Sequence, residues 1–152
     1  NMSTYFRRAT ARRTMTSKEI TDATYQIKAG DHGKTLLLNR AAGMTLTLPA
    51  DTLFFGFTVK MIVRDSFSGS WEITGAADGD LFFGAVATVS VAAKADKFAP
   101  NGSSNDTLKA NSDAKGRLAG SWVEFTLMGA NEWLVDGTLI AGGTPATPFA
   151  DT

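Results

Sequence analysis

The chain contains a single histidine, His32, in the segment AGDHGKT, where Asp31 and Lys34 stand close to it. These side chains are of the types used in acid–base catalysis, which also needs a nucleophile within hydrogen-bond reach of the histidine. No GxSxG or comparable motif supplies that nucleophile. The flanking Gly30 and Gly33 are typical of a turn. We therefore interpret the segment as a turn and expect no catalytic residue in it.

Metal and cofactor sites are not expected either. Asp78-Gly79-Asp80 resembles the start of a calcium loop, but Val89 occupies the twelfth position, where a bidentate glutamate is needed. A tight turn before the run Leu81–Phe83 is the simpler interpretation. The absence of cysteine excludes zinc–cysteine sites, thiol nucleophiles and disulfides. Neither a GxxxxGK[ST] nor a GxGxxG phosphate-binding motif is present.

Three aspartates are candidates for paired-carboxylate hydrolysis, namely Asp96, Asp106 and Asp113. All three lie in one polar segment, and carboxylates in such segments are solvated by default. A glycan or peptide hydrolase that uses a carboxylate such as Asp106 is therefore kept only as a third hypothesis.

Tryptophan side chains are candidates for stacking on a sugar. Trp71, Trp122 and Trp133 each lie in or beside an alternating apolar run. Packing in the core or against a hairpin is the simpler interpretation for each of them. Stacking of a glycan on Trp71 or Trp122 remains the alternative.

The first 18 residues form a basic arm with five basic residues and no acid, so the rest of the chain carries a net charge of −5. Arginine binds carboxylate or phosphate through its planar fork, and apolar side chains add anchoring. The acidic remainder argues against a broad nucleic-acid-binding face. A solvated end without function is the alternative. The residues that we predict to bind a partner, either a capsid or a neighbouring protomer, are Tyr5, Phe6, Arg7, Arg8, Arg12, Arg13 and Lys18.

The arm has too little apolar surface to fold alone, so we expect it to become ordered on a partner. A short helix at about 5–13, capped by Ser3 or Thr4, is the alternative. The arm lacks the apolar stretch of a signal peptide, and no run approaches the length of a membrane span.

The remaining sequence predicts one all-β domain, and 152 residues are enough for one hydrophobic core. Met44, Leu46 and Leu48 alternate with threonines, which is typical of a half-buried strand. Strands at intervals of about 8–12 residues favour a compact antiparallel β-sandwich or barrel. Strands are predicted at 34–39, 44–49, 56–64, 70–74, 81–83, 86–92, 121–128 and 131–137, with a hairpin joining the last two.

The domain organisation follows from these elements. Residues 1–21 are assigned to the extended basic arm and residues 22–143 to the β domain. Residues 94–120 are predicted to be one long polar loop, which at this length is expected to be functional or mobile. Residues 144–152 form an extended tail, with Phe149 as its anchor.

Two segments together resemble the β-rich head decoration, or cement, proteins of tailed bacteriophages. They are KAGDHGKTLLLNRAAGMTLTLPADTLFFGFTVKMIV at 28–63 and GSWVEFTLMGANEWLVDGTLIAGG at 120–143. The resemblance covers under half of the chain and consists of turn and strand patterns.

The resemblance implies a non-enzymatic viral structural protein on the outer surface of the virion. It would bind the major capsid protein and bridge its subunits, which stabilises the head, and it would assemble as a homotrimer. We expect neither a membrane nor a nucleic acid as partner. The main alternative is a fibre or tail-associated module that binds a host-surface glycan.

Overall fold

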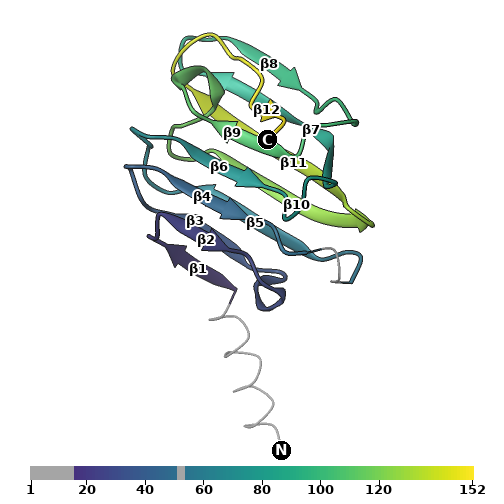
Figure 1. Cartoon of the computed structure of the whole chain (residues 1–152). Coiled ribbons are helices and arrows are strands. Elements are labelled where there is room, and N and C mark those ends of the chain that lie inside the picture. The colour runs from purple at the N-terminus through teal and green to yellow at the C-terminus, as the bar shows by residue number, and fades with distance from the viewer. Residues whose placement is uncertain (1–15, 51–53) are drawn as a thin grey trace, which may run out of the picture.

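A computed structural model of the chain describes residues 16–50 and 54–152, and these form two β-sheets packed face to face (Figure 1). The predicted all-β sandwich is therefore confirmed. The seven-stranded sheet runs in the order β1 (Ser17–Ile20), β3 (Thr35–Leu38), β5 (Thr58–Val63), β10 (Trp122–Gly129), β11 (Glu132–Ala141), β7 (Leu81–Ser90), β8 (Ala95–Phe98). The five-stranded sheet runs in the order β12 (Phe149–Ala150), β9 (Thr107–Ala110), β6 (Trp71–Thr74), β4 (Met44–Thr47), β2 (Thr24–Gln26).

The first six strands alternate between the two sheets. β1, β3 and β5 are parallel neighbours in one sheet, and β2, β4 and β6 are parallel neighbours in the other. The chain therefore winds as a roll, in which each turn leads to the opposite sheet. This corrects the prediction of a wholly antiparallel sandwich, because both sheets are mixed.

The later strands complete both sheets with mostly antiparallel pairs. β10 and β11 form the predicted hairpin, with a bulge between Leu127 and Gly129. β11 also pairs with β7 in parallel over ten residue pairs, from Glu132↔Leu81 to Ala141↔Ser90. The two strands predicted at 81–83 and 86–92 are thus one strand.

Three predicted boundaries are corrected. Residues 17–20 form β1, so the part of the predicted arm after residue 16 belongs to the sheet. The predicted loop 94–120 contains β8, β9 and the short 3-10 helix η2 (Asp113–Lys115). The tail contains β12, whose Phe149 is buried as expected.

The core lies between the sheets and is filled by the alternating apolar residues. Phe57, Val59, Met61 and Val63 on or beside β5 are at most 1% exposed, which confirms the predicted inward face of this strand. Val123, Phe125 and Leu127 of β10 are likewise buried. Side chains at alternate positions must therefore point to the outside of the sheet.

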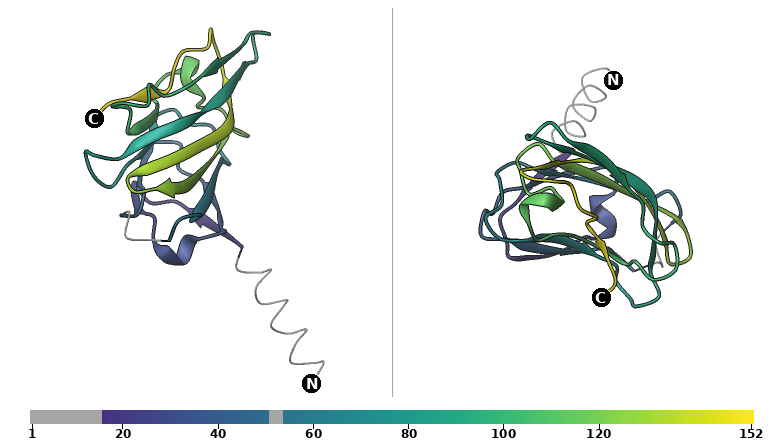
Figure 2. Two further views of the ribbon diagram at one scale, coloured as in Figure 1. Left: turned by 90° about the vertical axis from the view of Figure 1, so that its right-hand side faces the viewer. Right: turned by 90° about the horizontal axis from the view of Figure 1, so that it is seen from above.

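The two short helices lie at opposite ends of the sandwich. η1 (Ala29–Asp31) follows β2 at the end where β1 starts, and η2 lies near β9 at the other end (Figure 2). Thr152 also lies toward the end that holds η2 (Figure 2).

Candidate functional site

Lys18 is the one predicted partner-binding residue that the structure describes. The other six, from Tyr5 to Arg13, lie outside the described residues. Lys18 lies on β1, and its Nζ donates a hydrogen bond of 3.0 Å to the Tyr25 hydroxyl and sits 4.8 Å from the centre of that ring. The hydroxyl in turn donates to Oδ2 of Asp31 at 2.9 Å. Lys18 is thus engaged within the domain, where it connects the edge strands of the two sheets.

The pKa values of Lys18 and Tyr25 are both raised, for different reasons. The hydrogen bond from its ammonium to Tyr25 raises the pKa of Lys18. Burial, which disfavours the phenolate, raises the pKa of Tyr25. Both groups therefore keep their protons more firmly in the folded protein.

The segment around His32 forms the predicted turn. Asp31 ends η1, and its Oδ2 accepts a hydrogen bond of 3.0 Å from the backbone N–H of Lys28. The His32 Nδ1 accepts a hydrogen bond of 3.1 Å from the backbone N–H of Thr58, and the ring packs edge-on against Phe54 at 4.8 Å. These contacts fix the connection into β5.

The structure spreads the aspartates considered for chemistry over separate places. Asp96 is exposed on β8, and among the described residues its Oδ1 accepts only the backbone N–H of Lys97, at 2.9 Å. Asp80 is buried and its Oδ2 accepts the backbone N–H of Ala76 at 2.8 Å, which closes the predicted turn before β7. Asp106 is only 3% exposed, so the prediction that it is solvated is wrong. Asp113 lies in η2 and pairs with Arg117 at 2.6 Å.

The tryptophans divide into two buried rings and one on the surface. Trp71 and Trp133 are fully buried, which excludes Trp71 as a platform for a sugar. The Trp71 Nε1 donates to the carbonyl of Gly116 at 3.0 Å. Trp122 is half-buried on the outside of the seven-stranded sheet, where the Lys60 Nζ lies 4.6 Å from its ring centre.

We call the side of the seven-stranded sheet that faces away from the five-stranded sheet the outer face. The strand registers place its side chains in rows that run across the strands. One row contains Leu37, Ile62, Trp122, Thr138, Ala87 and Lys97. The next row contains Ser17, Thr35, Lys60, Glu124, Asp136 and Ala85.

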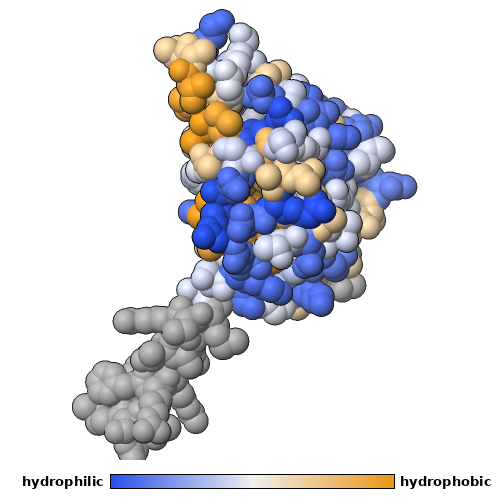
Figure 3. Space-filling model, turned by 90° about the vertical axis from the view of Figure 1, so that its left-hand side faces the viewer, coloured by the Kyte–Doolittle hydropathy of each residue, from blue (hydrophilic) through white to orange (hydrophobic). Residues whose placement is uncertain are grey.

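Large apolar side chains are exposed on and around this face. Val89 near the end of β7 is 46% exposed, Val91 directly after this strand is 70% exposed, and Leu134 on β11 is 42% exposed. Phe54 and Phe55, in the connection into β5, are 54% and 64% exposed. Hydrophobic residues gather along the upper left margin of the molecule in Figure 3. Exposed apolar side chains mark interaction surfaces where they form a contiguous patch.

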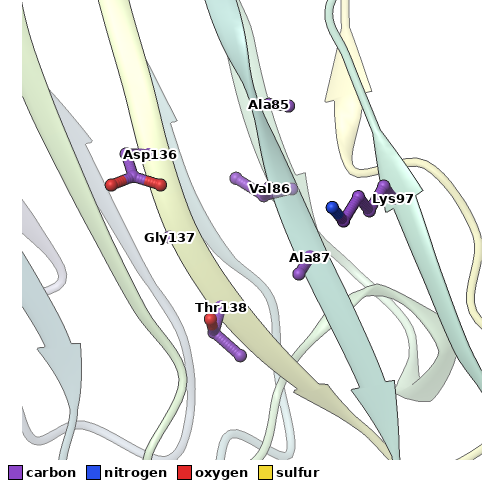
Figure 4. A pocket seen from close by; sticks show the side chains of 7 residues that line it. All are labelled: Ala85, Val86, Ala87, Lys97, Asp136, Gly137 and Thr138. Atoms are coloured by element: carbon purple, nitrogen blue, oxygen red, sulfur yellow. The ribbon is translucent and has the colours of Figure 1, made fainter.

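A shallow pocket of about 290 Å³ lies over β7 on the outer face. Alanine side chains form its floor, and Asp136 and Lys97 stand on opposite sides of β7 (Figure 4). Thr138, the neighbour of Trp122 across the strands, also lines it. The pocket therefore combines small apolar groups with a carboxylate, an ammonium and a hydroxyl.

Glu124 and Asp136 stand directly opposite each other on β10 and β11. Neither carboxylate has an ion pair or a side-chain hydrogen bond with any part of the chain that the structure describes. Lys60, which is opposite Glu124 on the other side, is turned to Trp122. Like charges directly opposite each other destabilise a sheet, so this acid pair favours a cationic partner. Neither the pair nor the row that contains it was identified from the sequence, because strand register is needed to find them.

No protein-family model matches the chain, and no curated protein matches its sequence. Within residues 16–50 and 54–152, no group of three or more histidine, aspartate or glutamate side chains is placed to hold a metal ion. The helices in the described part of the chain are too short to cross a membrane.

Proposed function

We propose that the protein is a non-enzymatic structural protein that decorates the outer surface of a tailed-phage capsid. It bridges neighbouring subunits of the major capsid protein and thereby stabilises the head. In this proposal it assembles as a homotrimer, and the basic arm and the outer face make the contacts.

The observation that carries the proposal is the exposure of large apolar side chains on a rigid two-sheet scaffold. Val91 and Phe55 are about two-thirds exposed, and Val89, Leu134 and Met128 are more than 40% exposed. Burial of such groups against a partner contributes roughly 25 cal/mol per Å² of apolar surface. A protein whose function is to bind a protein lattice gains affinity from this surface.

The arrangement of the two resembling segments supports the same proposal. Segment 28–63 supplies β3, β4 and β5, and segment 120–143 supplies β10 and β11. β4 lies in the five-stranded sheet, and the other four strands are consecutive neighbours in the seven-stranded sheet. The residues that carry the resemblance to decoration proteins thus make the centre of one sheet and much of the outer face.

The decisive experiment is to count the copies of the protein per virion relative to the major capsid protein. A decoration protein is present in hundreds of copies, at a fixed ratio to the capsid subunit. Light scattering on the free protein and images of particles test the trimer. A handful of copies per particle would overturn the proposal and favour a fibre or tail component.

A second candidate function is binding of a host-surface glycan. The observation that favours it is the half-buried Trp122 next to Thr138, which lines the shallow pocket. Lys60 lies over the Trp122 ring, so a sugar would have to displace it in order to stack there. Quenching or enhancement of tryptophan fluorescence by host glycans, and its loss in Trp122→Ala, would support this candidate.

A further inference from the structure

We propose that residues 1–15 of the free protein dock on the outer face of their own chain, with Arg12 and Arg13 bound to Glu124 and Asp136. This inference does not depend on the identity of the external partner. It identifies an internal acceptor for the basic arm.

Charge complementarity is the first argument. The first 15 residues hold four arginines and no acid, so residues 16–152 carry a net charge of −4. Glu124 and Asp136 are adjacent and without partners among the described residues. An arginine doublet brings two positive forks to two carboxylates and relieves their mutual repulsion. The free energy of docking therefore includes relief of an unfavourable contact as well as new ion pairs.

Reach is the second argument. Ser17, the first residue of β1, lies in the same transverse row as Glu124 and Asp136. With strands about 4.8 Å apart, Glu124 is three strands or about 14 Å away, and Asp136 is four strands or about 19 Å away. The carbonyl oxygen of Thr16 still accepts the backbone N–H of Thr35, so the arm leaves the sheet at Thr16. An extended chain then covers about 10 Å back to Arg13 and about 14 Å back to Arg12. The long stem of each arginine side chain covers the remaining distance, so the Arg12–Arg13 doublet can reach this acid pair.

Tethering is the third argument. A short flexible link gives the arm an effective concentration in the millimolar range at its own sheet. Exposed ion pairs are individually weak, so they cannot hold two separate molecules together but can populate a tethered contact. The docked arm therefore exchanges with the detached arm and stays available to an external partner.

Paramagnetic relaxation tests the proposal on the full-length chain. The protein has no cysteine, so Thr10→Cys gives a single attachment point for a nitroxide label. We expect selective broadening of amide signals on the outer face, at 122–126 of β10 and 134–138 of β11. Because docking is electrostatic and intramolecular, the broadening should be lost at about 1 M salt, where the Debye length is about 3 Å. It should not change when the protein is diluted.

Matched variants complete the test. Glu124→Gln with Asp136→Asn removes both charges while keeping side-chain size, and the broadening should be lost. Asp22→Asn with Asp78→Asn makes the same change in net charge at exposed sites elsewhere and should keep it. Amide chemical shifts in the core report that each variant is folded. Broadening that persists in the Glu124/Asp136 variant, spreads evenly over the surface, or disappears on dilution would overturn the proposal.

Discussion

Asp106 connects the start of β9 to Thr152 through its carboxylate. Its Oδ1 accepts the backbone N–H of Thr152 at 3.0 Å, and its Oδ2 accepts the Thr152 hydroxyl at 2.6 Å. The Thr107 hydroxyl donates to Oδ1 at 3.1 Å. This carboxylate therefore accepts three hydrogen bonds and holds the residues after β12 in place.

We predict that Asp106→Ala lowers the free energy of unfolding by about 1–3 kcal/mol, because the buried Thr107 hydroxyl and the two Thr152 donors lose their acceptor. Chemical denaturation followed by circular dichroism measures the change. Asp78→Ala at the exposed turn before β7 is the control and should change stability by less than about 0.5 kcal/mol. Equal effects of the two substitutions would show that Asp106 is not a structural tie.

The raised pKa of Tyr25 determines how the stability of the fold depends on pH in the alkaline range. Its pKa is raised by burial, and that of Lys18 is raised by the hydrogen bond to Tyr25. A group whose pKa is raised by folding stabilises the fold at pH values below its ordinary pKa, which is 10.0 for tyrosine and 10.5 for lysine. That stabilisation is lost as the pH rises through the pKa of the folded state.

We therefore expect the wild-type protein to lose stability between about pH 9 and 12 more steeply than Tyr25→Phe. At neutral pH this variant should be about 0.5–1.5 kcal/mol less stable, since it lacks the hydroxyl that joins Lys18 to Asp31. Thermal unfolding across the pH series gives both quantities. Tyr5, the only other tyrosine in the chain, provides the control: Tyr5→Phe should keep the wild-type slope.

At the scale of elements, two turns of the roll stack directly on each other. The turn between β3 and β4 meets the turn between β5 and β6, and the backbone N–H of Gly69 donates to the carbonyl of Ala41 at 3.0 Å. A Cβ on Gly69 would lie 2.0 Å from the carbonyl oxygen of Ala42, and one on Gly43 would lie 2.7 Å from that of Ser70. The two backbones approach each other as closely as they do only because both positions are glycine.

Gly69→Ala should accordingly destabilise the roll by about 1–3 kcal/mol, since one of the stacked turns must move away. Gly79 offers a matched control, because a Cβ there would have no atom within 4 Å. Differential scanning calorimetry of Gly69→Ala and Gly79→Ala compares the two positions. If Gly69→Ala unfolds at the wild-type temperature, the turns do not depend on this contact.

Strands with strong alternation were predictable from the sequence, and strands that depend on pairing were not. The inward faces of β5 and β10 follow from their period of two, and the β10–β11 hairpin follows from its short turn. β8 has three exposed residues out of four, so it lacks an apolar pattern, and β1 has one buried residue. Their strand geometry is set by the ladders to β7 and β3.

Local sequence patterns also do not determine whether two strands pair in parallel or antiparallel. A short apolar run followed by a turn looks the same whether the next strand pairs with it or crosses to the opposite sheet. The parallel roll of β1–β6 therefore could not be read from spacing. The same holds for the acid pair on the outer face, since Glu124 and Asp136 are 12 positions apart and meet only through the register of β10 and β11.

At the scale of the whole molecule, charge is divided between a basic arm and an acidic body. We predict that deletion of residues 1–15 leaves the sandwich folded, weakens attachment to particles and makes the remaining attachment less sensitive to salt. The deletion stops before β1 because Ser17–Ile20 belongs to the sheet. Occupancy on purified particles across a salt series, for the intact and the shortened protein, measures the effect.

Replacement of the four arginines of the arm by lysine is the control for this experiment. It keeps the charge and removes the planar fork, so it separates the effect of charge from that of the guanidinium group. If the shortened protein binds as tightly as the intact protein at every salt concentration, the arm has no part in attachment and the sandwich alone makes the contacts.

The parallel pairing of β1 with β3 has a mechanical consequence. A pull that enters the chain at Ser17 along the strand axis loads all four residue pairs of this ladder at once, in shear. β12 is held to β9 by only two residue pairs, together with the Asp106 tie to Thr152. Under tension between the two ends, β12 should detach while β1 still bears the load. Residues 1–15 thus precede the terminal strand that has the stronger pairing and resists such a pull longer.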